Sequence, residues 1–315
     1  MKKPAGVIVA IFLGSMLSLA PGVKKTSEND EVKLGRKLFF DRMLSRNYSI
    51  SCAHCHRPEF AFSDTVALSK GFEGRLTTRN APPLTNLGER PYFFWDGREQ
   101  TLEAQVFQPI QHPDEMGLSL NELNIRLLSN KEYLKEFHKV YGKPPSVQLA
   151  AKAIAAFEST LETGNSPFDR FMQGDSNAIS KEAIAGREIF MGKAKCFDCH
   201  FSPDFTGDEF KNIGLFNGKK LNDSGRFLVS RKNEDLGKFR VPGLRNIALT
   251  APYMHNGMFR TLNEVIDYYN NPDKIVPDAQ NRDTTFLKPL GLTTGEKSAL
   301  IYFLQSLTSP SATSR

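Results

Sequence analysis

The chain has 315 residues, a formal net charge of +6, 40% hydrophobic residues and 24% charged residues. This length is enough for two ordinary domains, and the composition is that of a soluble globular protein. Basic residues form isolated pairs such as Lys24-Lys25 and Lys219-Lys220, so the charge pattern argues against nucleic-acid binding and favours a partner with an acidic surface.

The first 22 residues have the layout of a secretory signal peptide. Lys2 and Lys3 precede an apolar stretch from about residue 5 to residue 20, and small residues follow it. Pro21 disfavours cleavage after Ala20, so an uncleaved anchor is the alternative. No later stretch is long and apolar enough to span a bilayer. We therefore expect a periplasmic protein that is not an integral membrane protein once processed.

The first half contains a short amphipathic helix followed by a cysteine motif. The helix is predicted around LGRKLFF (34–40), and SCAHCH (51–56) follows it. A long loop is predicted over 79–91, because proline and glycine recur there. Apolar residues at three- and four-residue intervals then predict helices over 120–141 and 147–161.

The second half repeats this order. The helical pattern breaks in GNSPFDRFMQ (164–173), where we place the boundary between the halves. AGREIFM (185–191) then shares the pattern GR-[KE]-[LI]-F with the first half, and KCFDCH (195–200) follows it. A long loop is predicted over 204–241, and a final helix over 294–307 with Thr294 as its N-cap. Duplication of one unit explains the repeat, and no segment alternates like a β-strand.

The two cysteine motifs use every cysteine of the chain. In an exported protein they could form two disulfides or a redox dithiol, but no βαβ pattern surrounds them. A shared zinc site would need the usual finger or ribbon spacings, which a gap of about 140 residues does not match. C-x-x-C-H occurring twice indicates two covalently bound haem c groups. The residues that would attach the haems and ligate their irons are Cys52, Cys55 and His56, and Cys196, Cys199 and His200.

Residues 31–307 resemble the bacterial di-haem cytochrome c peroxidase family, and within it the MauG type. The resemblance lies in FFWDGREQTLEAQVFQPI (93–110), PDEMG (113–117), FRVPGLRNIALTAPYMHNG (239–257) and TLNEVIDYYN (261–270). It implies an all-α fold of two cytochrome c-like haem domains packed about a pseudo-two-fold axis, with long loops. The domains would be an N-terminal peroxidatic haem domain (25–168) and a C-terminal electron-transfer haem domain (169–315).

The resemblance also implies roles for single residues. Trp95, the only tryptophan, matches the indole between the haems, and Glu115 matches the distal acid that moves a proton between the oxygens of peroxide. Gln105 and Pro109 match residues that line the same pocket. One calcium ion is implied between the domains, and the positions that match its ligands are Asn80, Thr250 and Pro252.

Two departures from the better-known peroxidases stand out. Those enzymes carry a distal histidine on the loop after the first haem motif, but no histidine occurs between Arg57 and Gln111. The first haem is therefore expected to be open to peroxide. They also use a methionine fourteen residues after the histidine that corresponds to His255, and here that position is Tyr269, as in the MauG type. We expect Tyr269 to ligate the second iron; Met254 and Met258 are nearby alternatives.

These features predict an oxidoreductase that reduces hydrogen peroxide and takes electrons from a partner through the second haem. The partner would be a small redox protein or a protein substrate. One alternative is the oxidative maturation of a protein-derived quinone cofactor, as in methylamine dehydrogenase. The other is a non-catalytic di-haem electron carrier, which would need two six-coordinate irons.

Overall fold

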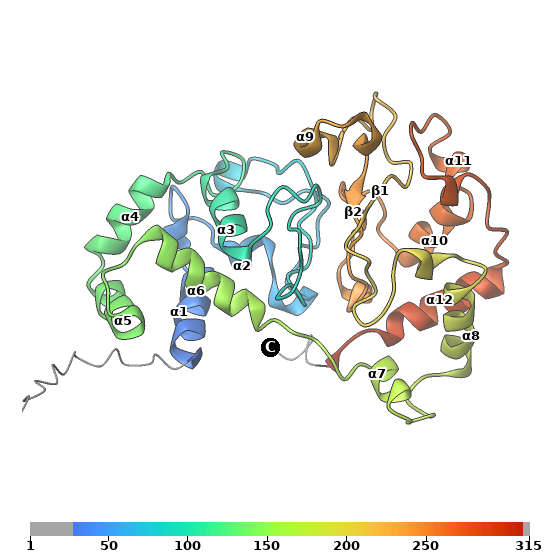
Figure 1. Cartoon of the computed structure of the whole chain (residues 1–315), viewed down its shortest axis with the longest axis horizontal. Helices are drawn as coiled ribbons and strands as arrows, with labels where there is room; N and C mark the ends of the chain where they lie inside the picture. The colour runs from blue at the N-terminus through green and yellow to red at the C-terminus, as the bar shows by residue number, and fades with distance from the viewer. Residues whose placement is uncertain (1–27, 311–315) are drawn as a thin grey trace, which may run out of the picture.

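The computed structural model describes residues 28–310, in two largely helical halves joined by one extended segment (Figure 1). The predicted signal peptide lies outside the described residues. The helices are α1 (Glu28–Phe40), η1 (Arg42–Leu44), α2 (Cys52–Cys55), η2 (Pro58–Phe60), η3 (Phe72–Gly74), α3 (Leu102–Gln111), α4 (Leu120–Ser129), α5 (Lys131–Tyr141), α6 (Val147–Ser159), α7 (Pro167–Met172), α8 (Lys181–Met191), η4 (Cys196–Asp198), α9 (Phe227–Ser230), η5 (Asn233–Asp235), η6 (Ile247–Leu249), α10 (Leu262–Asn270), α11 (Pro272–Ile275), η7 (Thr284–Phe286) and α12 (Thr294–Ser306). Within 28–310, no helix combines the length and the apolar character needed to cross a membrane.

A small antiparallel ribbon interrupts the predicted loop over 204–241. Strands β1 (Phe210–Lys211) and β2 (Phe239–Arg240) pair with Phe210 opposite Arg240. The sequence predicted no strand here, because two residues are too few to show an alternating pattern. The predicted loop over 79–91 contains no helix or strand. The fold is thus mostly helical with one minimal sheet.

Two helix boundaries differ from the predictions. The helix predicted over 120–141 is broken at Asn130, whose side chain accepts hydrogen bonds from the backbone N–H groups of Glu132 and Tyr133 and starts α5. The amphipathic period continues across this cap, so the period alone hides the break. The N-cap of α12 is Thr293 rather than Thr294, and its side chain forms a capping box with Glu296.

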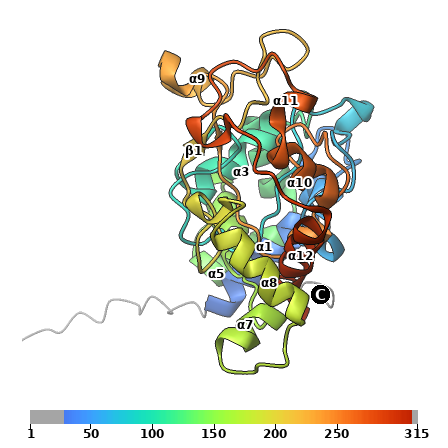
Figure 2. The same cartoon turned by 90° about the vertical axis from the view of Figure 1, so that its right-hand side faces the viewer.

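Each half has its own hydrophobic core, and the repeated GR-[KE]-[LI]-F helix is central to both. The buried residues of one core lie within 34–161 and those of the other within 168–307. Helix α1 packs on α6, and α8 packs on α12 (Figures 1 and 2). A Cβ atom built on Gly35 would lie 1.8 Å from the carbonyl oxygen of Ala153, and one on Gly186 would lie 1.9 Å from that of Ala299. The shared glycine is therefore required for close helix contact.

The two cores also share an aromatic arrangement. Phe39 is the phenylalanine of the shared pattern in the first half. It meets Phe62 and Phe157 edge-to-face, with ring centroids 6.0 and 5.2 Å away. In the second half the equivalent rings are Phe190, Phe205 and Phe303, whose centroids lie 5.1 to 6.1 Å apart. Such contacts stabilise a core beyond simple burial.

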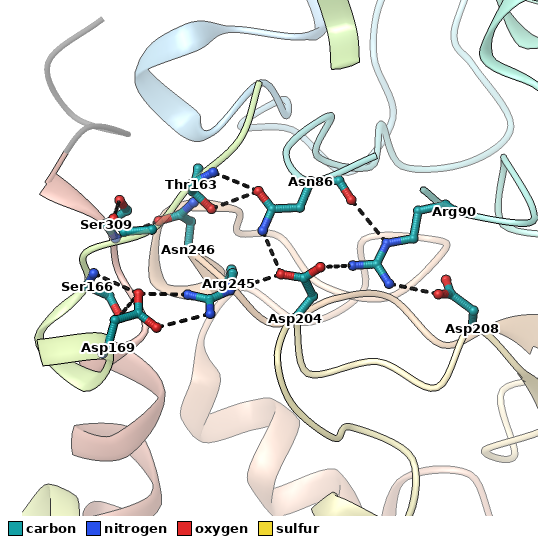
Figure 3. Close-up of polar contacts among 11 residues, drawn as sticks. Asn86, Arg90, Thr163, Ser166, Asp169, Asp204, Asp208, Arg245, Asn246 and Ser309 are labelled. Carbon is teal, nitrogen blue, oxygen red and sulfur yellow. Dashed lines mark hydrogen bonds and ion pairs between the residues drawn. The ribbon is translucent and has the colours of Figure 1, made fainter. Parts of the chain in front are cut away.

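A polar network joins the halves near the extended segment (Figure 3). One carboxylate oxygen of Asp204 accepts hydrogen bonds from Asn86 at 2.8 Å and Arg245 at 3.0 Å, and the other oxygen pairs with Arg90. Arg245 also makes two hydrogen bonds to Asp169, at 2.9 and 3.0 Å. All of these ionic side chains are half-buried, so their contacts constrain the halves more than exposed pairs would.

Candidate functional site

The first C-x-x-C-H motif presents a histidine with a defined tautomer. Cys52 to Cys55 form the short helix α2, and His56 follows directly. The chain then turns through Ala61 and Phe62, both with positive φ, which brings the carbonyl oxygen of Phe62 to 2.9 Å from His56 Nδ1. Because a carbonyl only accepts, Nδ1 carries the proton and Nε2 keeps the lone pair that a metal needs. Burial lowers the pKa of His56, which favours this neutral form.

The second motif repeats that geometry. His200 follows η4 and Cys199, and its Nδ1 lies 2.8 Å from the carbonyl oxygen of Phe205, which again has positive φ. Burial lowers the pKa of His200 as well. Each histidine is therefore oriented by a carbonyl five or six residues later, the arrangement typical of metal-ligating imidazoles.

The four cysteines are partly or fully buried neutral thiols. None forms a disulfide, and burial raises the pKa of Cys55 and Cys199 to about 11 and that of Cys196 to about 12. A redox dithiol needs a thiolate and hence a lowered pKa. The two pairs also pack against different cores, so they cannot pool into one four-cysteine zinc site. Two separate thiol pairs, each beside a neutral imidazole, fit two covalently attached haems.

An apolar cavity lies beside the second motif. Cys196, Cys199 and His200 line it, together with Tyr269 from α10. Its neighbour Tyr268 is completely buried in the core and donates a hydrogen bond to the carbonyl oxygen of Ile213 at 2.6 Å. The two adjacent tyrosines therefore face different surroundings, and only Tyr269 lines this cavity. Burial raises the pKa of Tyr269, so its phenol is neutral unless a metal binds it.

The same cavity contains other groups that could reach a metal. Met254 lines it, at a position with φ +73°, whereas Met258 is not among its lining residues. His255 lines it too, but its ring stacks on Phe239 with centroids 3.6 Å apart. Burial lowers the pKa of His255 to about 4.

The predicted distal acid lies near the first motif. Helix α3 places Gln105 and Pro109 four residues apart and so on one face, and Glu115 follows in the next loop. The Glu115 carboxylate is close enough to contribute to the raised pKa of both Cys52 and Cys55. Burial raises the pKa of Glu115, although His112 and Arg98 oppose the shift.

The loop after the first motif packs on the loop that carries Glu115. The Phe72 N–H donates to the Glu115 carbonyl oxygen at 2.8 Å, and the Phe72 ring lies against Gly117. A Cβ atom on Gly71 would lie 2.1 Å from the Asp114 carbonyl oxygen. This is the loop on which no histidine occurs, and its close packing supports the backbone of the acid.

Trp95 lies at the boundary between the two halves. Its indole N–H donates to the Asn80 carbonyl oxygen at 2.8 Å, and its own carbonyl accepts from Arg240 N–H at 2.8 Å. The Asn80 N–H in turn donates to the His255 carbonyl oxygen at 2.7 Å. The three predicted calcium positions, Asn80, Thr250 and Pro252, line the same cavity as Trp95. The Asn80 amide nitrogen donates to the carbonyls of Val66 and Ala67, which leaves its oxygen as an acceptor.

Sequence reasoning missed the equivalence of Trp95 and His255. Both follow a residue with positive φ, Phe94 or Met254, and both precede a glycine with positive φ by two residues. The signal was present, because PYFFWDG (91–97) and PYMHNG (252–257) align with one gap and each continues to Thr-Leu at a helix start.

Sequence reasoning also missed Arg79, which pairs with Asp96 at 2.6 Å and with Asp223 across the halves at 2.6 and 2.8 Å.

Comparisons with known proteins show which family the chain resembles. A family model described as di-haem cytochrome c peroxidase matches residues 29–177. The methylamine utilization protein MauG of Methylorubrum extorquens is 37% identical over 280 residues, covering 88% of this chain and 78% of the relative. Cytochrome c551 peroxidase of Nitrosomonas europaea is 35% identical, with 82% of each chain covered. A crystal structure of a MauG-like protein associated with microbial copper homeostasis has a TM-score of 0.82 at 33% identity, with 90% of each chain covered.

Proposed function

The chain belongs to the di-haem cytochrome c peroxidase family, and on this premise we propose that it reduces hydrogen peroxide at a first c-type haem and draws electrons from a partner through a second. One observation carries the proposal. Two motifs with the same histidine geometry face different side chains, the acid Glu115 at the first and the phenol of Tyr269 at the second. An electron carrier has no need for this difference.

The residues of the two motifs would hold the cofactors. Cys52 and Cys55 would form thioethers to the first haem, and Cys196 and Cys199 to the second. When bound, the haems supply one metal centre that reacts with peroxide and a second redox centre that shares the oxidising equivalents. The hydrogen bonds from His56 and His200 to backbone carbonyls would keep each Nε2 directed at its metal.

At the first site, Glu115 would act as the acid–base group. Burial raises the pKa of the carboxyl, which makes it a better proton acceptor, and it would take a proton from the nearer oxygen of peroxide and return it to the leaving oxygen. Gln105 and Pro109 would shape the pocket in which peroxide lies. Hydrogen bonding of the Glu115 carbonyl to Phe72 holds the acid's backbone in place.

At the second site, Tyr269 would be a ligand of the iron together with His200. Its place on the cavity wall supports this role, and a phenolate, being anionic, would favour the higher oxidation state of the iron. Trp95 would carry charge between the sites. Asn80, Thr250 and Pro252 would bind one calcium ion through oxygen atoms, which are the ligands that calcium prefers.

Reciprocal contacts support two haem domains, 25–168 and 169–315, related by a pseudo-two-fold axis. Asn80 N–H bonds to His255, and Arg240 N–H bonds to Trp95, across the boundary between halves. Trp95 and His255 have equivalent turn geometry, and the carbonyl of each accepts a bond from the other half, which supports the pseudo-two-fold arrangement. With the signal-like N-terminus, we propose that the mature protein works in the periplasm.

A second function is supported by the similarity to MauG of Methylorubrum extorquens. With Tyr269 at the second site, the protein would instead oxidise a bound protein substrate during maturation of a quinone cofactor. In both functions the reductant docks on the surface, so the same peroxide chemistry would serve either partner.

The test is the addition of one equivalent of peroxide to the ferric holoprotein. We expect the absorption of both haems to change rapidly without prior reduction, and the resting spectrum to show one high-spin and one low-spin haem. Two low-spin haems and no reaction would refute the peroxidase function and leave an electron carrier.

A further inference from the structure

His112 is a histidine next to the proposed acid that has no role so far. It caps the C-terminal end of α3, and its Nδ1 lies 3.9 Å from Oε1 of Glu115. The His112 side chain is 41% exposed and the Glu115 side chain 30% exposed, so the imidazole is the more exposed of two neighbouring groups.

The chemistry needs a proton supply at this place. Reduction of one hydrogen peroxide to two waters consumes two protons together with two electrons. Glu115 can move a proton between the two oxygens, but it brings none in from outside. A partly exposed imidazole beside the carboxyl is a suitable entry point, because one of its ring nitrogens can accept a proton while the other carries one.

We propose that His112 relays protons from solvent to Glu115; this proposal rests on the proposed peroxidase function. At rest the Asp114 N–H donates to His112 Nδ1 at 3.2 Å, so Nδ1 holds a lone pair and the ring proton is on Nε2. The imidazole takes up a proton at Nδ1, its bond from Asp114 breaks, and the new N–H turns to Glu115. Transfer to the carboxylate returns the imidazole to its neutral form, so each cycle moves one proton and no electrons.

The backbone around the relay is held so that only the side chain must move. The His112 carbonyl oxygen accepts from both Glu115 N–H and Gly117 N–H at 3.0 Å. The charged neighbours are of both signs: Asp114 and Arg98 act on Glu115, and Arg75 lies 3.5 Å from the Pro113 carbonyl oxygen. Glu73 pairs with Arg75 at 3.2 Å and so offsets its charge.

The test variant is His112→Asn, in which the amide oxygen can accept the Asp114 N–H in place of Nδ1 and keep the turn. The matched control is His138→Asn, on the exposed face of α5. In the holoprotein supplied with excess electron donor, we expect the steady-state rate of peroxide reduction to fall about tenfold in His112→Asn, because uptake of outside protons becomes limiting, and to stay unchanged in the control. In a Glu115→Gln background the His112→Asn change should add nothing. An equal loss in that background, or no loss at all, would overturn the relay.

A second measurement does not depend on turnover. In the ferrous holoprotein with CO bound to the first haem, the haem nearer to His112, ¹⁵N-histidine NMR should show His112 protonated on Nε2, assigned by its absence from His112→Asn. A proton on Nδ1 instead would contradict the relay. A wild-type protein that does not consume peroxide would refute the proposed function and the relay together, whereas an active wild type with an unaffected His112→Asn would refute the relay alone.

Discussion

Replacing Gly186 with alanine tests the contact between α8 and α12. The new Cβ would lie 1.9 Å from the Ala299 carbonyl oxygen and 2.9 Å from Phe303 Cβ. To reach ordinary contact the helices must separate by roughly 1.5 Å, which loosens the packing of Phe190 and Phe205 with Phe303. Neither atom in the clash can rotate away, because one is backbone and the other is a Cβ.

The expected loss is at the upper end for overpacking, about 3 kcal/mol, or a fall in Tm of roughly 6–12 °C. Thermal unfolding of the holoprotein followed by far-ultraviolet circular dichroism measures it. The matched control is Gly295→Ala, in α12, where nothing lies within 4 Å of the new Cβ; helix propensity predicts an unchanged or slightly higher Tm. Because Gly35 occupies the same position in the repeated helix, Gly35→Ala should lower the Tm as Gly186→Ala does. A Tm within 2 °C of wild type for Gly186→Ala would refute the reasoning.

Three further predictions concern the site and the boundary between the halves. Glu115→Gln should slow the reaction with peroxide at least about a hundredfold in stopped-flow measurements, and a rate within twofold of wild type would exclude an acid–base role. Tyr269→Phe should alter the absorption and electron paramagnetic resonance of the second haem alone, and an unchanged spectrum would exclude ligation. Burial raises and hydrogen bonds from Arg245 lower the pKa of Asp169, with a net lowering. The Asp169–Arg245 pair therefore stabilises the folded protein above the unfolded-state pKa of ~4, and this stability is lost as the pH falls through the lower folded-state pKa. Asp169→Asn should therefore make the unfolding free energy depend less on pH on the acid side. An equally steep acid side would contradict this.

Local spacing in the sequence was enough to predict the elements whose structure depends on residues close along the chain. The two C-x-x-C-H motifs and the helices before them were predicted, because covalent spacing determines what lies beside a short motif. The distinction between Tyr268 and Tyr269 could also be predicted, since adjacent helix residues point in different directions. Asn130 was missed because an amphipathic period can continue across a cap, although Asn before Lys-Glu is itself a capping signal.

The sequence by itself therefore determined the two haem motifs, their repeated helix and the identity of the side chains available to each site. Only the tertiary structure decided what meets across the halves. Asn80 bonds to His255 and Arg240 to Trp95, and Asp204 is held by Arg90. Contacts between residues more than a hundred positions apart depend on how two cores pack together, and no local period or spacing records that packing.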